Sequence, residues 1–315
     1  MQLPLVGLSS ASRAAEGAGS QAEAIELLQR IFNATKRLSY SGTFIYRQGE
    51  ISETSRIARL VPASGVPEER IEALDGSPRE IHRVNDEVRC YLPTTKTIKV
   101  EQIAADRTLL PIAPTRVADL AEHYEITKGA PERIAGYECQ SIELKPRDKL
   151  RYGHRLWADP VTGMVLKAQT TDGASLIEQF VFTQLRIGPF PRRELESHLN
   201  TAQWKVERSG GVAADLSASG WSIEEMPAGF RKLAEMKRSF PANSEVGQIV
   251  LSDGLAAVSV FIERLREGVP TGASRQGAIN VFSRRVNNEY LITAVGELPP
   301  AGVQAIAAAL RYRGP

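Results

Sequence analysis

The sequence lacks long apolar runs, has few cysteines and histidines, and carries almost no net charge. No stretch approaches the ~20 apolar residues that a helix needs to cross a bilayer, which excludes a helical membrane protein. Its 39 Lys and Arg residues nearly balance 37 Asp and Glu residues, a net charge of +2, so no overall basic field exists to attract nucleic acid. None of the histidines stands three to five residues from another His or a Cys, so no metal site is predicted.

The sequence also lacks the motifs that mark common enzymes. It has no nucleophile elbow, no Walker loop, no dinucleotide fingerprint and no zinc-binding helix. Gly210-Gly211 is followed by Val-Ala-Ala instead of a phosphate loop and a helix, which is typical of a flexible linker. No pair of carboxylates stands out from ordinary surface charge. We therefore predict a protein that is not an enzyme and needs no cofactor.

The two cysteines, Cys90 and Cys139, are too few and too far apart for a zinc ribbon or a redox pair. They form either one disulfide or two buried thiols. A bridge would close a loop of about 50 residues and contribute ~4 kcal/mol on the chain-entropy model. Export to an oxidising compartment favours the bridge, and a reducing cytosol favours the thiols.

An amphipathic helix is the first element that the sequence predicts, over residues 22–38. Five side chains share one of its faces at helical spacing: Ile25, Leu28, Phe32, Thr35 and Leu38. Before it, a short apolar patch and a group of small residues resemble the end of a secretory signal, although no basic region precedes them. Residues 1–21 are expected to be a leader or a signal remnant.

From Tyr40 onward the apolar period changes from about 3.6 to 2 residues, which predicts strands. The expected strands of this first unit are Tyr40–Arg47, Ser55–Val61, Arg70–Leu74, Glu80–Asn85, Glu87–Leu92, Thr97–Ile103, Ile134–Pro146, Tyr152–Ala158, Met164–Thr171 and Leu176–Ile187. A short helix is expected over 116–124 and a hairpin turn at Asp159–Gly163. Such regular short strands indicate a meandering antiparallel sheet or barrel.

A domain boundary is predicted where Gly, Ser, Ala and charge replace the periodic apolar pattern, over residues 188–220. We assign 22–200 to the first domain, 201–220 to a linker and 221–315 to a second, small α+β domain. Its expected strands are Gln248–Ser252, Ala256–Leu265, Gly277–Asn287 and Tyr290–Glu297, followed by a helix from Ala301 to about Arg311. A hairpin turn is expected at Asn287-Asn288 because Asn tolerates positive φ.

Aromatic side chains recur on the predicted strands of the first unit, at Tyr40, Phe44, Tyr46, Tyr91, Trp157, Phe180 and Phe182. Two interpretations are open: these side chains line an apolar cavity in an incompletely filled barrel, or they form an ordinary hydrophobic core. The residues alone favour ordinary core, because strand aromatics usually pack.

Several segments together are similar to the MucB/RseB family of periplasmic regulators of the sigma-E envelope-stress pathway. They are Leu38–Tyr46 (LSYSGTFIY), Arg83–Pro93 (RVNDEVRCYLP), Tyr152–Lys167 (YGHRLWADPVTGMVLK), Glu178–Phe182 (EQFVF), Ser252–Glu263 (SDGLAAVSVFIE) and Val295–Pro299 (VGELP). The resemblance extends from about Ala22 to Leu310, nearly the whole chain.

The resemblance implies a mainly β (α+β) protein. Its N-terminal domain would be an unclosed antiparallel β-barrel with plugging helices, like the lipoprotein carriers LolA and LolB, followed by a small α+β C-terminal domain. It implies a periplasmic protein that binds the periplasmic segment of a transmembrane anti-sigma factor of the MucA/RseA type. It also implies that the protein shields that segment from site-1 proteolysis and is released by lipid or lipopolysaccharide. A periplasmic location favours the Cys90–Cys139 disulfide.

The resemblance also changes the interpretation of the aromatic side chains, which become candidates for a lipid-cavity lining. The cavity candidates are Leu38, Tyr40, Phe44, Tyr46, Tyr91, Trp157, Phe180 and Phe182. For partner contact we choose Phe261, Arg264, Arg284 and Arg285. Val258, Val260 and Ile262 are expected to be domain core. The alternative function is a periplasmic lipid or lipoprotein carrier of the LolA type, and a homodimer is left open.

Overall fold

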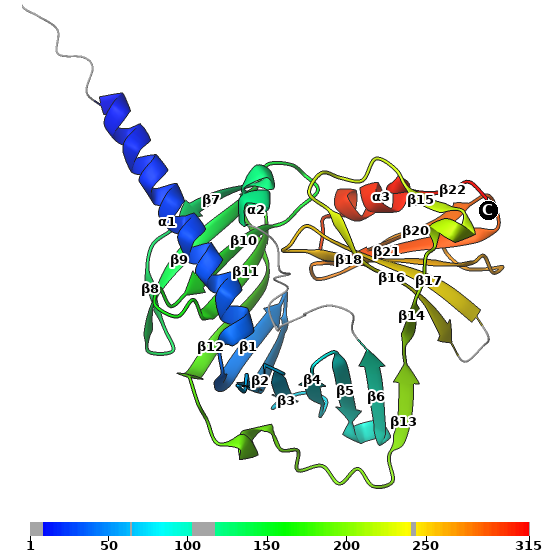
Figure 1. Cartoon of the computed structure of the whole chain (residues 1–315), viewed down its shortest axis with the longest axis horizontal. Coiled ribbons are helices and arrows are strands. Elements are labelled where there is room, and N and C mark those ends of the chain that lie inside the picture. The colour runs from blue at the N-terminus through cyan, green and yellow to red at the C-terminus, as the bar shows by residue number, and fades with distance from the viewer. Residues whose placement is uncertain (1–8, 64, 103–116, 241–243, 315) are drawn as a thin grey trace, which may run out of the picture.

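The computed structural model describes residues 9–63, 65–102, 117–240 and 244–314, which form two β-rich units (Figure 1). The first unit contains one long, curved sheet with helices α1 and α2 against it. Its elements are α1 (Ser9–Arg37), β1 (Tyr40–Gln48), β2 (Ile51–Leu60), β3 (Glu68–Ala73), β4 (Glu80–Val84), β5 (Glu87–Leu92), β6 (Thr97–Gln102), α2 (Val117–His123), β7 (Tyr124–Lys128), β8 (Glu132–Ile134), β9 (Tyr137–Pro146), β10 (Gly153–Ala158), β11 (Val165–Asp172) and β12 (Ser175–Ile187).

The long sheet has thirteen strands and does not close. Its order is β13-β6-β5-β4-β3-β2-β1-β12-β11-β10-β9-β7, where β13 is Lys205–Ser209, and β8 lies beside β9. Among the described strands, β13 and β7 at the two ends of the sheet do not pair with each other. All pairs are antiparallel except β13 with β6. The meandering antiparallel sheet predicted from alternation is confirmed, and so is the unclosed, mainly β fold class.

Helix α1 packs against β7, β9 and the helix α2 because one of its faces is apolar. Its buried side chains include Leu28 and Ile31, which are fully covered, and Phe32. Each such side chain contributes about 1.5–3 kcal/mol when it is removed from water. The predicted face is largely correct, although Ile25 and Thr35 lie at its half-buried margin. The helix begins at Ser9, so part of the predicted leader is helical.

The segment that joins the two units is ordered, not featureless. Residues 188–204, which we call the strap, lie along the long sheet and include a short 3-10 turn, η2 (Arg192–Leu195). The strap leads into β13, which pairs with β6, and then into β14 (Gly211–Ala213), which pairs with β16 (Arg231–Phe240) of the second unit. The predicted linker 201–220 therefore contributes strands to both sheets (Figure 1).

The second unit is a seven-stranded antiparallel sheet with helix α3 on one face. Its sheet order is β14-β16-β17-β18-β21-β20-β19, and β15 and β22 form a separate pair. Its elements are η3 (Ser217–Ser219), β15 (Trp221–Ile223), β16 (Arg231–Phe240), β17 (Ser244–Ser252), β18 (Ala257–Arg264), β19 (Gly272–Gln276), β20 (Ile279–Val286), β21 (Tyr290–Gly296), α3 (Pro300–Ala309) and β22 (Leu310–Tyr312). The α+β expectation for this unit is confirmed.

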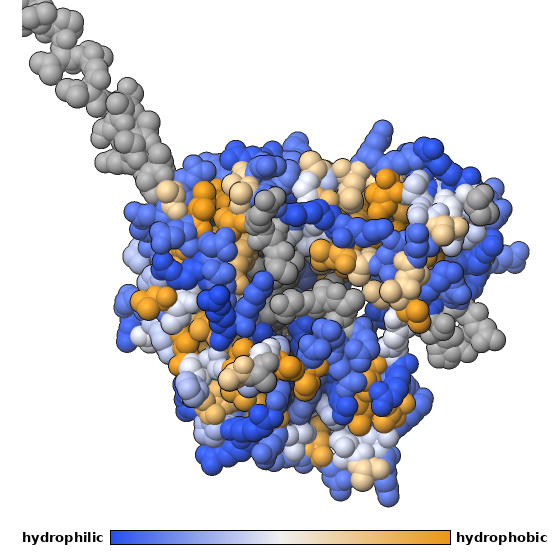
Figure 2. Space-filling view, in the orientation of Figure 1, coloured by the Kyte–Doolittle hydropathy of each residue, from blue (hydrophilic) through white to orange (hydrophobic). Residues whose placement is uncertain are grey.

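The core of the second unit lies between its sheet and α3. Val258, Val260 and Ile262 alternate into that core, as expected, and pack with Val303 and Ile306 of α3. Polar residues cover most of the face seen in Figure 2, and hydrophobic residues appear there in small separate groups. Among the described residues, no helix is both long and apolar enough to cross a membrane.

Candidate functional site

Most of the predicted cavity residues lie together in one aromatic cluster on the long sheet. The ring centroids of Phe44 and Phe180 are 4.8 Å apart, and those of Phe180 and Phe182 are 5.0 Å apart. The buried members among the candidates are Tyr40, Phe44, Trp157, Phe180 and Phe182, with Leu38 and Tyr46 packed against them. Burial raises the pKa of the Tyr40 hydroxyl, and the nearby Glu69 raises it further. The cluster therefore stays uncharged and apolar.

Tyr91 is the one candidate that lies apart from the aromatic cluster. It belongs to β5, and its ring centroid lies 4.9 Å from that of His82. Two pockets of the described residues are prominent, one beside β1 and one beside α1, and neither is lined by any of the eight candidates. The lipid-cavity role of the cluster therefore stays a prediction.

The four partner-contact candidates differ in their exposure and in the contacts that their side chains make. Arg264 is exposed, pairs with Glu289 at 3.1 Å and lies over the Tyr290 ring at 4.6 Å. Arg285 is exposed, and Phe261 is half-buried on the face of β18 opposite the core. These three remain candidates for contact with a partner.

Arg284 has a structural role instead. Its Nε donates to the carbonyl oxygen of Ala307 at 2.9 Å, and its Nη2 donates to that of Leu310. These carbonyls end helix α3, where cations and donors are favourable. Burial lowers the pKa of Arg284. Arg284, on β20, therefore binds the C-terminal end of α3.

The predicted disulfide is absent, because Cys90 and Cys139 are both free thiols in the structure. Cys90 lies on β5 and Cys139 on β9, and seven strands separate β5 from β9 in the sheet order. The sequence offered no way to see this separation. Burial raises the pKa of the Cys139 thiol to about 11, which keeps it protonated and unreactive.

A buried cluster of mainly polar residues joins the two units, and we call it the joint: Tyr124, Arg151, His154, Asp253 and Leu255. Asp253 lies in the turn between β17 and β18, and its side chain is 1% exposed. Its Oδ1 accepts the N–H groups of Leu255 at 3.0 Å and Ala256 at 2.9 Å. Its Oδ2 accepts the Tyr124 hydroxyl at 3.1 Å and Arg151 Nε at 2.9 Å. The buried carboxylate is thereby fully hydrogen-bonded.

Arg151 connects three segments that are distant in the sequence. Besides Asp253, its guanidinium donates to the Asp148 carboxylate and to the Ala228 carbonyl oxygen. It also lies over the Phe230 ring, 5.0 Å from the centroid. Since Ala228, Phe230 and Asp253 all belong to the second unit, this one side chain fixes two of that unit's loops to the first unit.

His154 and Leu255 complete the joint. The His154 ring centroid lies 6.3 Å from that of Tyr124, and its Nε2 is buried with no hydrogen-bond partner among the described residues. Burial lowers the pKa of His154 to about 4, against an opposing effect of Asp253, so the ring is neutral near pH 7. Leu255 inserts from the second unit into the core formed by α1, α2 and β7.

A second contact between the units lies near β20. Asn280 Nδ2 donates to the Tyr152 hydroxyl at 2.9 Å and to the Leu298 carbonyl oxygen at 2.7 Å. Sequence reasoning used Tyr152–Lys167 and Ser252–Glu263 as marks of resemblance and as sources of strands and candidate residues, without linking the two segments. The structure places Asp253 of the second segment against Arg151, which directly precedes the first, and this joint is what sequence reasoning missed.

This fold and joint define a class: a two-domain protein in which an unclosed, curved sheet is fixed to a small α+β domain. The MucB/RseB N-terminal domain model matches residues 23–205, and the MucB/RseB C-terminal domain model matches residues 215–311. The chain therefore belongs to the MucB/RseB family.

The relatives are regulators, not enzymes. The sigma factor AlgU regulatory protein MucB of Pseudomonas aeruginosa is 31% identical over 297 residues, with 92% of this chain and 91% of the relative covered. The sigma-E factor regulatory protein RseB of Salmonella typhimurium is 28% identical, with 91% and 90% covered. The expectation of a non-enzymatic regulatory protein is thereby confirmed.

Solved structures of relatives have the same fold. The complex of Pseudomonas aeruginosa MucA and MucB contains a chain with a TM-score of 0.74 and 28% identity, covering 93% of this chain and all of that one. A crystal structure of MucB in complex with MucA(peri) gives a TM-score of 0.71 at 28% identity, with the same coverage. A crystal structure of MucB gives a TM-score of 0.68 at 27% identity, covering 93% of this chain and 98% of that one.

Proposed function

We propose that this protein is a periplasmic regulator that binds the periplasmic segment of a transmembrane anti-sigma factor. Binding protects that segment from site-1 proteolysis, and lipid or lipopolysaccharide releases it, so that the sigma-E envelope-stress response is restrained until release. The observation that carries the proposal is the match of 93% of this chain to MucB in its complexes with MucA. A protein that only covers a cleavage site needs no catalytic group of its own.

The structure supports this proposal by the way in which it holds the two domains. The joint buries Asp253 and Arg151 and inserts Leu255 into the other domain's core, so both domains present one fixed surface. A surface formed in advance loses less entropy on binding than one that must be assembled. Arg264 and Arg285 are exposed on the second domain and suit an acidic stretch of partner.

Release by lipid requires that the lipid bind the partner-free form more tightly than the partner-bound form. The aromatic cluster around Phe44, Phe180 and Phe182 is the candidate acyl-chain site. Substituting one of its rings by a smaller side chain would change lipid binding without touching Arg264 or Arg285. Lipid binding and partner binding are therefore separable by mutation.

The test is a binding measurement between the full chain and the periplasmic segment of its own organism's anti-sigma factor, with and without lipopolysaccharide. We expect binding that lipopolysaccharide reverses, and slower cleavage of the segment by its site-1 protease when the protein is present. The variants Arg264→Glu and Arg285→Glu are expected to weaken binding. Arg133→Glu, an equally exposed arginine on β8, is the matched control.

Other outcomes separate the proposal from its alternative. Binding that lipopolysaccharide leaves unchanged would support the anti-sigma factor as the partner and contradict release by lipid. No binding, together with lipid found by mass spectrometry in the purified protein, would favour a lipid or lipoprotein carrier of the LolA type.

A further inference from the structure

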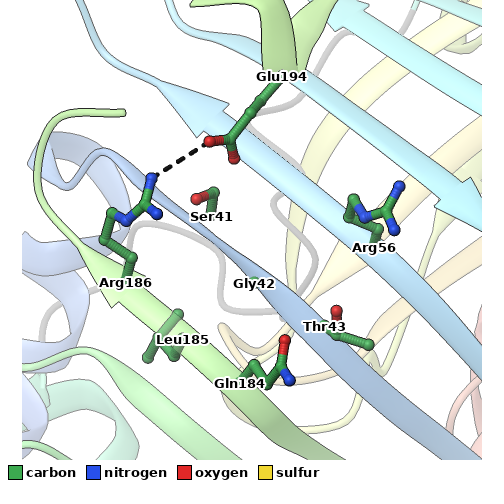
Figure 3. A pocket seen from close by; sticks show the side chains of 8 residues that line it. All are labelled: Ser41, Gly42, Thr43, Arg56, Gln184, Leu185, Arg186 and Glu194. Carbon is green, nitrogen blue, oxygen red and sulfur yellow. Dashed lines mark hydrogen bonds and ion pairs between the residues drawn. The ribbon is translucent and has the colours of Figure 1, made fainter. Parts of the chain in front are cut away.

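A pocket of about 320 Å³ lies on the first domain, under the strap and next to β1. Its walls are lined by Ser41, Gly42, Thr43, Arg56, Gln184, Leu185, Arg186 and Glu194 (Figure 3). Because side chains alternate along a strand, Ser41 and Thr43 point away from the face that carries Tyr40 and Phe44. The pocket is thus on the opposite face of the sheet from the aromatic cluster.

The hollow exists because small residues on β1 stand between long ones on its two neighbours. Thr43 pairs with Arg56 of β2, and Ser41 pairs with Arg186 of β12. Figure 3 shows the two arginines on opposite sides of the small residues. A bulge interrupts the pairing of β1 with β12 between Thr43 and Phe44. Bulges of this kind often re-aim side chains beside functional sites.

The two arginines are held by weak ion pairs. Arg186 pairs with Glu194 of the strap at 3.2 Å, and its side chain is 58% exposed. Arg56 pairs with Glu72 at 3.2 Å and is 52% exposed, and Glu72 is shared with Arg70 at 3.1 Å. Such exposed pairs contribute only about 0–1 kcal/mol, so a stronger anion can displace a single carboxylate from either guanidinium.

We propose that this pocket binds a phosphate group, supplied either as free phosphate or as the monoester headgroup of a lipid. Two guanidinium groups on opposite sides, the hydroxyls of Ser41 and Thr43 and the amide of Gln184 offer donors to all the oxygens of a tetrahedral dianion. A carboxylate has only two oxygens and one charge. The phosphate replaces Glu194 on Arg186, so the strap loses one of its attachments when the pocket fills.

The site goes beyond the proposed function, and its test needs neither the anti-sigma factor nor lipopolysaccharide. The test is calorimetric titration of the full chain with inorganic phosphate at low salt. Arg186→Gln removes a charged donor, so we expect affinity to fall about tenfold or more. Glu194→Gln removes the competing carboxylate, so we expect affinity to rise about two- to fivefold.

The opposite signs of these two effects separate a built pocket from general surface attraction. The matched controls are Arg133→Gln and Glu138→Gln, which alter an exposed ion pair of 3.6 Å on β8 and β9, and β10 and β11 separate β9 from β12 in the sheet order. Both controls are expected to leave phosphate affinity within about 1.5-fold of the unaltered protein. Unchanged circular dichroism spectra would exclude misfolding as the cause of any loss.

Vesicles distinguish the two sources of the phosphate group. Binding to phosphatidylcholine vesicles that contain phosphatidate, lost in Arg186→Gln and absent without phosphatidate, would assign the site to a lipid headgroup. Binding of inorganic phosphate alone would assign it to a soluble ligand. The proposal is overturned if phosphate does not bind, if Glu194→Gln brings no gain, or if Arg133→Gln costs as much affinity as Arg186→Gln.

Discussion

Two of the connections between the domains, the joint and the strap, are built in opposite ways. In the joint, Asp253 and Arg151 are each 1% exposed, and each carboxylate oxygen of Asp253 accepts two hydrogen bonds. In the strap, Arg192 is 64% exposed where it pairs with Glu68 at 2.6 Å. An ion pair is costly to break where water is excluded and contributes little where water competes for both partners.

This difference indicates which connection can change in response to a ligand. A ligand shifts an equilibrium only between states whose free energies are close. Opening the joint would leave a buried guanidinium and carboxylate unpaired and would withdraw Leu255 from the first domain's core. Lifting the strap breaks exposed pairs such as Arg192 with Glu68 and Arg186 with Glu194. We therefore expect the joint to stay closed and the strap to move.

The largest expected effect is that of Asp253→Asn in the joint. The change removes the charge that faces Arg151 in the protein interior, which costs about 3–5 kcal/mol of the free energy of unfolding. Urea unfolding followed by tryptophan fluorescence measures it. Asp215→Asn is the matched control, because Asp215 accepts a backbone N–H in an exposed turn, and it should leave the free energy of unfolding nearly unchanged. Equal losses in the two variants would contradict a special role for the joint.

The next effect is the response of the joint to acid. The pKa of His154 is about 4 in the folded protein and 6.5 in its ordinary state, so the unfolded chain takes up the proton first as the pH falls. The contribution of neutral His154 to the free energy of unfolding is fully present above pH 6.5. It is lost between pH 6.5 and 4, and the total loss is about 3 kcal/mol. Urea unfolding at pH 7, 6 and 5 measures the slope. His154→Phe should flatten that slope, and a slope that this variant leaves unchanged would contradict the assignment.

The elements of the fold were predictable where one face of a strand is buried. Alternation gave the bounds of β18 to within one residue at each end, Ala256–Leu265 against the observed Ala257–Arg264, because buried side chains alternate there with half-buried ones. Asn287 and Asn288 form the expected turn, both with positive φ, 50° and 55°. Strand β19 escaped prediction because all five of its residues are exposed, so no alternation marks it. Strand β16 also escaped prediction, because its charged residues obscure its period.

The joint was less predictable, because its residues are distant in the sequence and come together only in the folded chain. The Ser252-Asp253-Gly254 turn is visible in the sequence, but the other partners of Asp253 lie 129 and 102 residues away. The disulfide prediction failed for the same reason, since the distance between β5 and β9 depends on the order of strands in the sheet. Arg284 looked like a surface charge, and only the position of α3 reveals what it binds.

A smaller effect is expected from Glu80→Gln on the outer face that the strap covers. Burial favours the protonated form of Glu80, but hydrogen bonds from His82, Arg70 and Ser197 of the strap outweigh it and lower its pKa to about 2. The ionised group therefore stabilises the fold above about pH 4.5, and this contribution is lost as the pH falls towards 2. Replacing it should cost about 2 kcal/mol at pH 7. A variant that still lost stability as steeply between pH 4.5 and 2 would contradict this assignment.

The smallest effect is expected from Arg192→Gln in the strap itself. Its pair with Glu68 is exposed, so we expect a loss of about 0.5 kcal/mol in the free energy of unfolding, smaller still in high salt. Local opening should nevertheless increase, because the strap is then held by fewer attachments. Hydrogen exchange of residues 188–204 measures that opening, with the β17–β18 turn as the internal reference. Faster exchange in the strap and unchanged exchange at Asp253 would separate the two connections, whereas equal changes in both would mean that they open together.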